Sequence, residues 1–286
     1  MADHRRHHFD AESASVLSPQ WLAALRASAD QPPLRPRVPL ALGPHVIGSV
    51  EPDYFNQISR QYSSIGLELL QKEESADGPV WRLRGDGTLA LQQIAQALRD
   101  ARVGCVAQQW RQEQLAVCNA HGQQLATVER GVARPLGIAT RAVHLVGRVI
   151  DGRIWVQQRA FNKANDPGLW DTLMGGMVSA ADTVETALVR ETWEEAGIRL
   201  SSVDNLLLGG CVALRKPSPE DGSSGYVVEQ IDWFHCTVPD GVQPLNLDGE
   251  VEQFILLEKR ELLSRLERNE FTTEAALILV AALGWQ

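Results

Sequence analysis

The sequence predicts a mixed α/β fold of the α+β kind, in a chain long enough for one large or two modest folded units. Short runs such as Val80–Leu83 alternate apolar and polar residues and end at glycine-rich turns, which is typical of strands. Other stretches repeat apolar residues at helical spacing, as Leu91, Ile94, Ala95 and Leu98 do. Both kinds of segment occur in each half of the chain, so we expect sheets and helices together in both.

Composition and charge exclude several classes of protein. The chain is 44% hydrophobic and 22% charged, with a formal net charge of −9, which is ordinary for a globular protein. An acidic balance argues against a general nucleic-acid or anionic-membrane surface. It leaves an anionic small-molecule substrate open, because local arginines and a metal can reverse the sign inside a pocket. No apolar run approaches about 20 residues and the N-terminus has no apolar signal region, so we expect a cytoplasmic protein.

The four cysteines, Cys105, Cys118, Cys211 and Cys236, do not form a C-x-x-C pair. This spacing argues against a zinc site and predicts buried free thiols in a reducing compartment.

The first 36 residues are polar and end in a proline-rich stretch, so we expect a flexible N-terminal arm over residues 1–36. Within it, Ser18 to Ala29 predicts a short helix that Ser18 caps and Pro19 begins.

Residues 37–130 predict a small α+β domain without a catalytic constellation. A helix is expected from Pro52 to about Gln61 and a second one over Leu89–Ala101. The expected strands are Val80–Leu83, Leu115–Cys118 and Leu125–Glu129.

Residues 131–286 predict a second, larger domain. His144–Val149 and Arg153–Gln158 form a hairpin through the favoured turn Asp151-Gly152. The further elements expected are the strands Leu206–Leu214, Tyr226–Val238 and Val251–Leu257 and the helices Lys259–Glu270 and Thr273–Leu283.

The rest of the chain is organised around Gly175 to Ile198. On a helix, Glu191, Glu194 and Glu195 share one face because they are three and four residues apart. Like charges at this spacing repel by about 0.2–0.5 kcal/mol per pair, so the cluster favours a hard cation with oxygen ligands, Mg²⁺ or Mn²⁺. Gly197 follows at the position where a helix ends with a left-handed residue.

These residues resemble the Nudix box, G-x5-E-x7-R-E-U-x-E-E-x-G-U, in which U is a bulky apolar residue. Here the match runs from Gly176 through Arg190-Glu191 and Glu194-Glu195 to Gly197-Ile198. Asp182 stands where the family has its first glutamate, and Thr192 occupies one apolar position. The segment from Asp182 to Glu185 also reads as a helix-capping box with Asp182 or Thr183 as the N-cap, which explains the change to aspartate.

The resemblance implies an α/β/α sandwich with a mixed sheet and a Mg²⁺-dependent (or Mn²⁺-dependent) diphosphohydrolase. It implies that Glu191, Glu194, Glu195 and the Gly175 carbonyl are the metal ligands. Arg190 would hold a glutamate in place, so that Glu194 and Arg190 are catalytic.

A further catalytic acid is expected from a later loop. Glu250 is the first candidate for a general base or an extra ligand, with Glu220 and Asp221 as rivals. Arg159, Gly176 and Trp170 are expected at the substrate; a surface role for Arg159 and a core role for Trp170 are the alternatives.

The wider stretch from Asp166 to Ile198 resembles the Nudix subgroup related to thiamine pyrophosphokinase, in which a small N-terminal domain precedes the Nudix domain. This resemblance implies that thiamine diphosphate or its oxidised analogues are cut to the monophosphate and phosphate. The alternatives are a nucleoside diphosphate derivative as substrate, an isopentenyl-diphosphate isomerase, and a ligand-binding module with weak catalysis. The expected partner is a small-molecule diphosphate, and a homodimer stays open.

Overall fold

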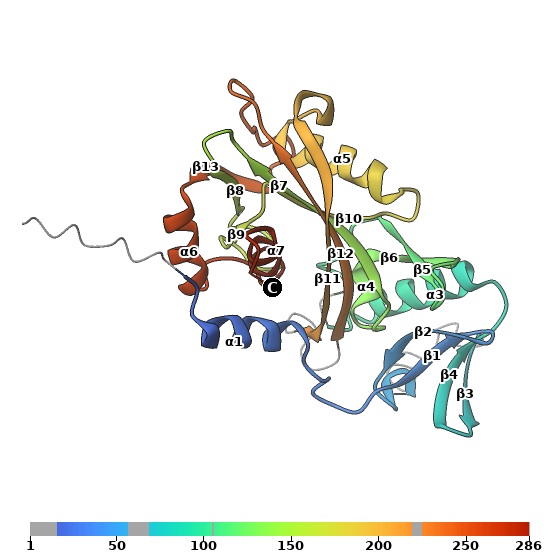
Figure 1. Cartoon of the computed structure of the whole chain (residues 1–286). Helices are drawn as coiled ribbons and strands as arrows, with labels where there is room; N and C mark the ends of the chain where they lie inside the picture. Colours follow the sequence, from blue (N-terminus) through green and yellow to red (C-terminus); the bar gives the residue numbers. More distant parts are fainter. Residues whose placement is uncertain (1–15, 57–68, 105, 219–224, 286) are drawn as a thin grey trace, which may run out of the picture.

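The computed structural model describes residues 16–56, 69–104, 106–218 and 225–285. It has a smaller N-terminal unit and a larger C-terminal unit, which lie side by side (Figure 1). Each unit has its own buried apolar cluster. The mixed α/β fold that the sequence predicts is therefore confirmed.

The N-terminal unit combines a four-stranded sheet, in the order β2-β1-β4-β3, with a separate β5-β6 hairpin. Helix α3 buries the apolar residues that its sequence spaces three and four apart, and Asp86 caps its first turn. Strand β3 and the single turn α4 were not expected from the sequence. The elements are β1 (Val38–Leu42), β2 (His45–Val50), β3 (Leu70–Ser75), β4 (Gly78–Leu83), α3 (Gly87–Asp100), β5 (Gln114–Cys118), β6 (Gln124–Glu129) and α4 (Arg130–Ala133).

The core of this unit extends past the expected boundary at residue 130. Val132, Ala133, Leu136 and Ile138 are each at most 2% exposed and pack in the N-terminal cluster. The second half of the helix expected from Pro52 to about Gln61 lies outside the described residues.

The C-terminal unit is built on a seven-stranded mixed sheet. Strand β12 runs parallel to β7, whereas β11 and β8 are antiparallel to their neighbours. Short strands β9 and β10 extend the pairing beside β8 and β7. The strands are β7 (Thr140–Arg148), β8 (Ile154–Arg159), β9 (Trp170–Asp171), β10 (Met174–Met177), β11 (Asp204–Ser218), β12 (Gly225–Thr237) and β13 (Val251–Leu257).

Helices cover both faces of this sheet, as the α/β/α sandwich requires (Figure 1). Side chains alternate between faces along β7: Val143 and Leu145 pack in the cluster of α5, while Ala142 and Val146 pack in the cluster of α6 and α7. The helices are α5 (Val184–Ala196), the 3-10 turn η2 (Leu200–Ser202), α6 (Lys259–Glu267) and α7 (Thr273–Ala282).

The expectation of a flexible arm over residues 1–36 is corrected for its described part. Helix α1 (Pro19–Ala29), capped by Ser18, packs against α7. The indole Nε1 of Trp21 donates to Asn269 Oδ1 at 3.0 Å. Leu17 is 1% exposed within the cluster of the C-terminal unit. Burial of these apolar groups explains why this segment is ordered.

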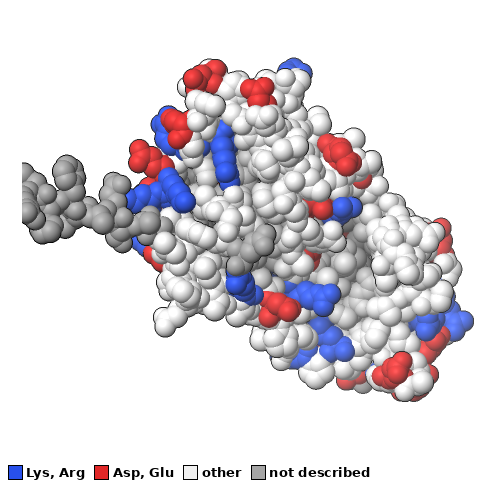
Figure 2. All heavy atoms as spheres, viewed as in Figure 1, with Lys and Arg blue, Asp and Glu red and all other residues white. Residues whose placement is uncertain are grey.

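No helix in the described ranges is long and apolar enough to cross a membrane. On the face shown in Figure 2, Lys and Arg lie scattered among Asp and Glu, without a continuous basic surface. Cys118, Cys211 and Cys236 are free thiols, but only Cys236 is buried; burial raises its pKa to about 12.

Candidate active site

Helix α5 holds the clustered glutamates in a fixed rotation. Thr183 begins it with a capping box shared with Thr186, and Gly197 ends it in the left-handed conformation at φ 62°. The apolar side of the helix packs on the sheet, and this turns Glu191 and Glu195 inward to 9% and 3% exposure. Two carboxylates of the Nudix box therefore lie in the protein interior.

Glu195 is the most enclosed of the three glutamates. Its Oε2 accepts a hydrogen bond from Gln157 Nε2 at 2.9 Å and one from the Gly175 amide at 3.1 Å. Burial outweighs these bonds and raises the pKa of Glu195 to about 8. The Gln157 side chain is itself buried, and its Oε1 has no hydrogen-bond partner.

Glu191 depends on Gly176 for its position. A Cβ added to Gly176 would overlap the Glu191 carboxyl group, so only glycine allows this approach. Burial raises the pKa of Glu191 to about 7, although the neighbouring Arg190 acts to lower it.

Arg190 joins three acids in one network. Its Nη2 and Nε donate to Asp182 Oδ2 at 2.8 and 3.0 Å, and its Nη1 donates to Glu191 at 2.9 Å and to Glu194 at 3.0 Å. Burial acts to raise the pKa of Asp182, but Arg190, Ser179 and other donors hold it below its ordinary value. Asp182 is thus the partner of Arg190, and Thr183 is the N-cap.

A cavity of about 120 Å³ opens beside Glu191 and Glu195. Seven carboxylates and four cationic side chains line it, so an anionic ligand would need additional positive charge there. The carboxylates are Asp166, Asp171, Glu191, Glu195, Glu229, Glu250 and Glu274; the cations are Arg130, Arg134, Arg159 and Lys163. Glu194 is outside this lining, and its side chain is 45% exposed beside Arg190.

The expected substrate residues divide between cavity and core. Arg159 and Gly176 line the cavity; Arg159 donates to the Asn165 carbonyl at 3.1 Å and lies 3.4 Å from Asp171. Trp170 is a correction: it is 7% exposed, packs in the core and carries Arg265 over its ring. It is not among the described residues that line the cavity, so packing is its role.

Glu250 also lines the cavity, where it forms an ion pair with Lys163. Burial acts to raise the pKa of Glu250, but Lys163, Arg130 and Arg159 together lower it below its ordinary value. The rival acids Glu220 and Asp221 lie outside the described residues.

The comparisons with known proteins identify the larger unit. A family model described as NUDIX domain matches residues 139–276. This stretch of the chain is a Nudix domain.

Three relatives show how the similarity is distributed. An uncharacterized protein of Saccharomyces cerevisiae is 28% identical over 60% of this chain and 54% of its own length. Nudix hydrolase 20, chloroplastic, of Arabidopsis thaliana is 28% identical over 51% of this chain and 38% of its own length. An isopentenyl-diphosphate Delta-isomerase of Streptomyces avermitilis is 29% identical over 59% of this chain and 82% of its own length. The chain thus spans about half or less of the first two relatives.

Among solved structures, DR0079 from Deinococcus radiodurans is similar, at a TM-score of 0.47 and 19% identity. The match covers 61% of this chain and all of that one.

The donors of the Nudix domain suit a hard cation even though they are not arranged as a closed site. Within the described ranges, no group of three or more His, Cys, Asp or Glu side chains is placed to hold a metal ion. The reason is local: the three carboxylates have separate partners, because Arg190 pairs with Glu191 and Glu194 and Gln157 bonds to Glu195. Buried carboxylates with raised pKa values are nevertheless the chemistry that a divalent cation stabilises.

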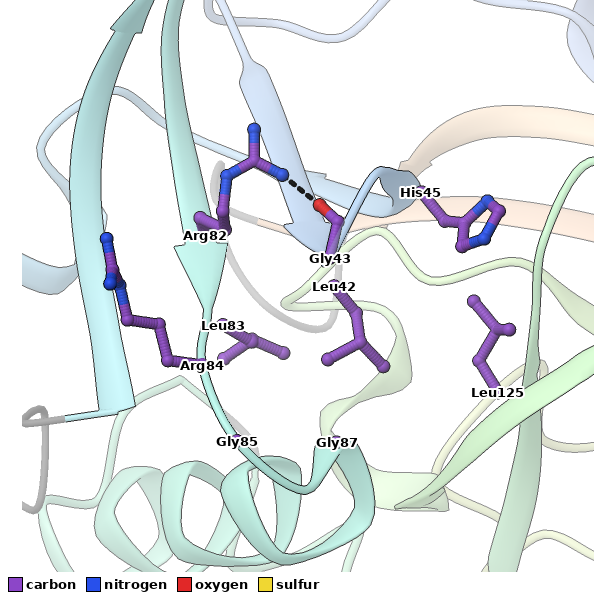
Figure 3. A pocket seen from close by; sticks show the side chains of 9 residues that line it. All are labelled: Leu42, Gly43, His45, Arg82, Leu83, Arg84, Gly85, Gly87 and Leu125. Carbon is purple, nitrogen blue, oxygen red and sulfur yellow. Dashed lines mark hydrogen bonds between the residues drawn. The ribbon is translucent and has the colours of Figure 1, made fainter.

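A larger cavity of about 710 Å³ lies in the N-terminal unit, away from these acids (Figure 3). Leu42, Leu83 and Leu125 form its apolar wall, and Arg82 bonds to the Gly43 carbonyl at its rim. Its arginines, Arg82 and Arg84, are paired with Glu73. It therefore lacks the carboxylate cluster that marks the Nudix site.

Sequence reasoning missed several residues of the Nudix cavity. His144 is 6% exposed, bonds to Thr172 Oγ1 at 2.9 Å, and occupies the space beside Gly175 where a Cβ would clash. Neither Arg130 nor Lys163 belongs to a sequence motif that points to this site. The signal available for Lys163 was its place in the polar loop just after Arg159.

Proposed function

We propose that the Nudix domain hydrolyses a diphosphate linked to another group, with Mg²⁺ or Mn²⁺ as cofactor. The observation that carries this proposal is the cavity where the buried Glu191 and Glu195 face Arg130, Arg159 and Lys163. The carboxylates suit a cation, and the guanidinium and ammonium groups suit phosphate oxygens.

Glu191, Glu194 and Glu195, with the Gly175 carbonyl, would hold the metal ion. Bound there, Mg²⁺ would neutralise phosphate oxygens as charge develops on them. Arg190 orients Glu191 and Glu194, and Gln157 with the Gly175 amide orients Glu195. Glu194 would reach the cavity only if its side chain adopted another rotamer, because its ion pair with Arg190 holds it outside.

The reaction needs one water molecule and no other reactant. Its oxygen forms a bond to one phosphorus, the bridging P–O bond breaks, and the products are a monophosphate and phosphate. Arg159 is placed at the cavity to bind phosphate oxygens through a planar guanidinium. Electrostatic stabilisation of the charge that develops around the reacting phosphorus is the main contribution of such a site to the rate.

Glu250 would act as an extra ligand rather than as the base that accepts the proton of water. A general base works best with a pKa near the operating pH, and Lys163 together with two arginines lowers the pKa of Glu250. A lowered pKa keeps this carboxylate charged, which suits a cation.

Thiamine diphosphate and its oxidised analogues are the first substrates that we propose. Support comes from the subgroup resemblance of the stretch from Asp166 to Ile198 and from two carboxylates at the cavity, the buried Glu229 and the half-buried Glu274. Carboxylates there would attract a positively charged ring. A nucleoside diphosphate derivative is the alternative, which needs no such charge.

The test is phosphate release from a panel of diphosphates with Mg²⁺ or Mn²⁺. The panel holds thiamine diphosphate, its oxo and oxy analogues, ADP-ribose, NADH and 8-oxo-dGTP. We expect metal-dependent release from the thiamine compounds. Release from a nucleotide alone would keep the hydrolase and discard the thiamine substrates; release from none, with metal bound, would favour a binding module.

The isomerase relative favours one second candidate, isomerisation of isopentenyl diphosphate. Against it, resemblance to the isomerase family would imply a cysteine in the active site, and no cysteine is among the described residues that line the acidic cavity. Formation of an allylic diphosphate from isopentenyl diphosphate would support this candidate.

A further inference from the structure

The N-terminal unit is joined directly to the Nudix box. Leu115 of β5 forms an antiparallel bridge with Ser179, and the Ala180 amide donates to the Gln114 carbonyl at 2.7 Å. Ser179 also donates to Asp182 at 3.0 Å. The edge of β5 therefore fixes the loop between Met177 and α5, which carries the partner of Arg190.

The same unit delivers two of the four cations in the acidic cavity. Arg130 begins the single turn α4, and Arg134 follows it. Val132 and Ala133 are buried in the N-terminal core, and a Cβ on Gly131 would lie 3.0 Å from the Gln109 carbonyl oxygen. Close packing on both sides of α4 sets the direction in which Arg130 leaves the backbone.

A second cavity, of about 80 Å³, adjoins the acidic one and continues it toward the N-terminal unit. The two share the residues Arg130, Arg134, Asn165, Met177 and Glu229. Gln109 and Arg111 line only the second cavity, where a group attached to the diphosphate would fit. The site is therefore a composite of both units.

Arg130 is held in place by an acid of its own unit. Its Nη1 lies 2.8 Å from Glu113 Oε2, and its side chain is 42% exposed. A guanidinium has five N–H donors, so one ion pair leaves others for a ligand. Glu113, Glu250 and Glu191 together raise the pKa of Arg130 although burial opposes them, so its positive charge acts on Glu191 and Glu250 in the cavity.

We propose that Arg130 is a substrate-binding residue that the N-terminal unit supplies to the Nudix site, where it contacts the diphosphate. This role rests on the proposed function and gives the N-terminal unit a part in it. Because carboxylates outnumber cations in the cavity, loss of one cation weakens an anionic ligand strongly. The N-terminal unit thus contributes a residue to the binding site.

The test measures binding of imidodiphosphate, a non-hydrolysable diphosphate, by calorimetry on the full chain with Mn²⁺ present. Arg130→Gln should raise its Kd about tenfold or more, as loss of a charged hydrogen bond does. The Kd of Arg130→Lys should fall between those of the wild type and Arg130→Gln. Arg153→Gln is the matched control, since Arg153 is 45% exposed in an ion pair with Asp151 away from the cavity.

A second readout separates binding from structure. Mn²⁺ binding followed by electron paramagnetic resonance should change much less than imidodiphosphate binding in Arg130→Gln. With a substrate that the protein turns over, KM should rise more than kcat falls. Unchanged imidodiphosphate affinity, or equal losses of Mn²⁺ and imidodiphosphate, would overturn the proposal. Binding of imidodiphosphate by the wild type without hydrolysis of any diphosphate would instead contradict the proposed function and leave Arg130 as a diphosphate ligand.

Discussion

The Glu191 carboxyl group fills the space that a side chain on Gly176 would need. Glycine at 176 therefore sets the position of a proposed metal ligand. In Gly176→Ala the added methyl group must displace Glu191, and such a misplacement costs about 100-fold in rate. We expect kcat/KM to fall by about this factor, measured with the best substrate of the panel.

The control for this prediction is the fold itself. Circular dichroism and the midpoint of thermal unfolding should show a folded Gly176→Ala protein. Full activity in a folded variant would mean that the position of Glu191 is not important for the reaction.

Asp182 stabilises the network around Arg190. Because Asp182 accepts two hydrogen bonds from the guanidinium, Asp182→Ala should lower the free energy of unfolding by about 1.5–3 kcal/mol. The control is Asp151→Ala, whose ion pair with Arg153 is exposed to solvent and should contribute little to stability. Urea titrations of both variants give the comparison, and equal losses would contradict a special role for Asp182.

The stability of the metal-free protein should fall as the pH rises. The pKa values of Glu191 and Glu195 are raised from 4.5 to about 7 and about 8. Between these limits the folded state binds more protons than the unfolded chain, so the free energy of unfolding decreases with pH. The stabilising effect is complete below the unfolded value and is lost as the pH passes the folded values.

Urea midpoints with a chelator present, from about pH 5 to about pH 8, measure this slope. Glu195→Gln, which cannot ionise, should show a shallower decrease, and Mg²⁺ should stabilise the wild type most at the alkaline end. An equal slope in both proteins would show that Glu195 is not protonated in the metal-free fold.

The segment before α1 should contribute to the stability of the Nudix domain. Leu17 is 1% exposed, whereas its neighbour Val16 is 67% exposed. Leu17→Ala should therefore lower the free energy of unfolding by about 2–5 kcal/mol, and Val16→Ala should change it little. Equal urea midpoints for the two variants would mean that this segment behaves as a flexible arm and does not stabilise the domain.

Local signals in the sequence were sufficient for most elements and for the box. The cap at Thr183 and the stop at Gly197 depend on neighbouring residues only, and so do the turn at Asp151-Gly152 and the helical spacing of α3. Helix α4 could not be predicted, because a single turn has no periodicity and forms here through packing on the N-terminal core.

The composition of the cavity could be predicted only in part, because it depends on tertiary position. Glu191 and Glu195 share a helix face, which spacing reveals. Arg130 comes from the other unit, and nothing near it in the sequence links it to the box. The sequence leaves two roles open for Trp170, in the core or at the pocket. Only the tertiary position of β9 shows that it packs in the core.

The central claim is that the inward glutamates of α5 bind a divalent cation for diphosphate hydrolysis. Mn²⁺ binding and kcat should be compared in the wild type, Glu195→Gln and Glu185→Gln, the last being an exposed glutamate of the same helix. The account predicts that Glu195→Gln loses Mn²⁺ affinity and turnover together while Glu185→Gln keeps both. Undiminished Mn²⁺ binding and turnover in Glu195→Gln would contradict it.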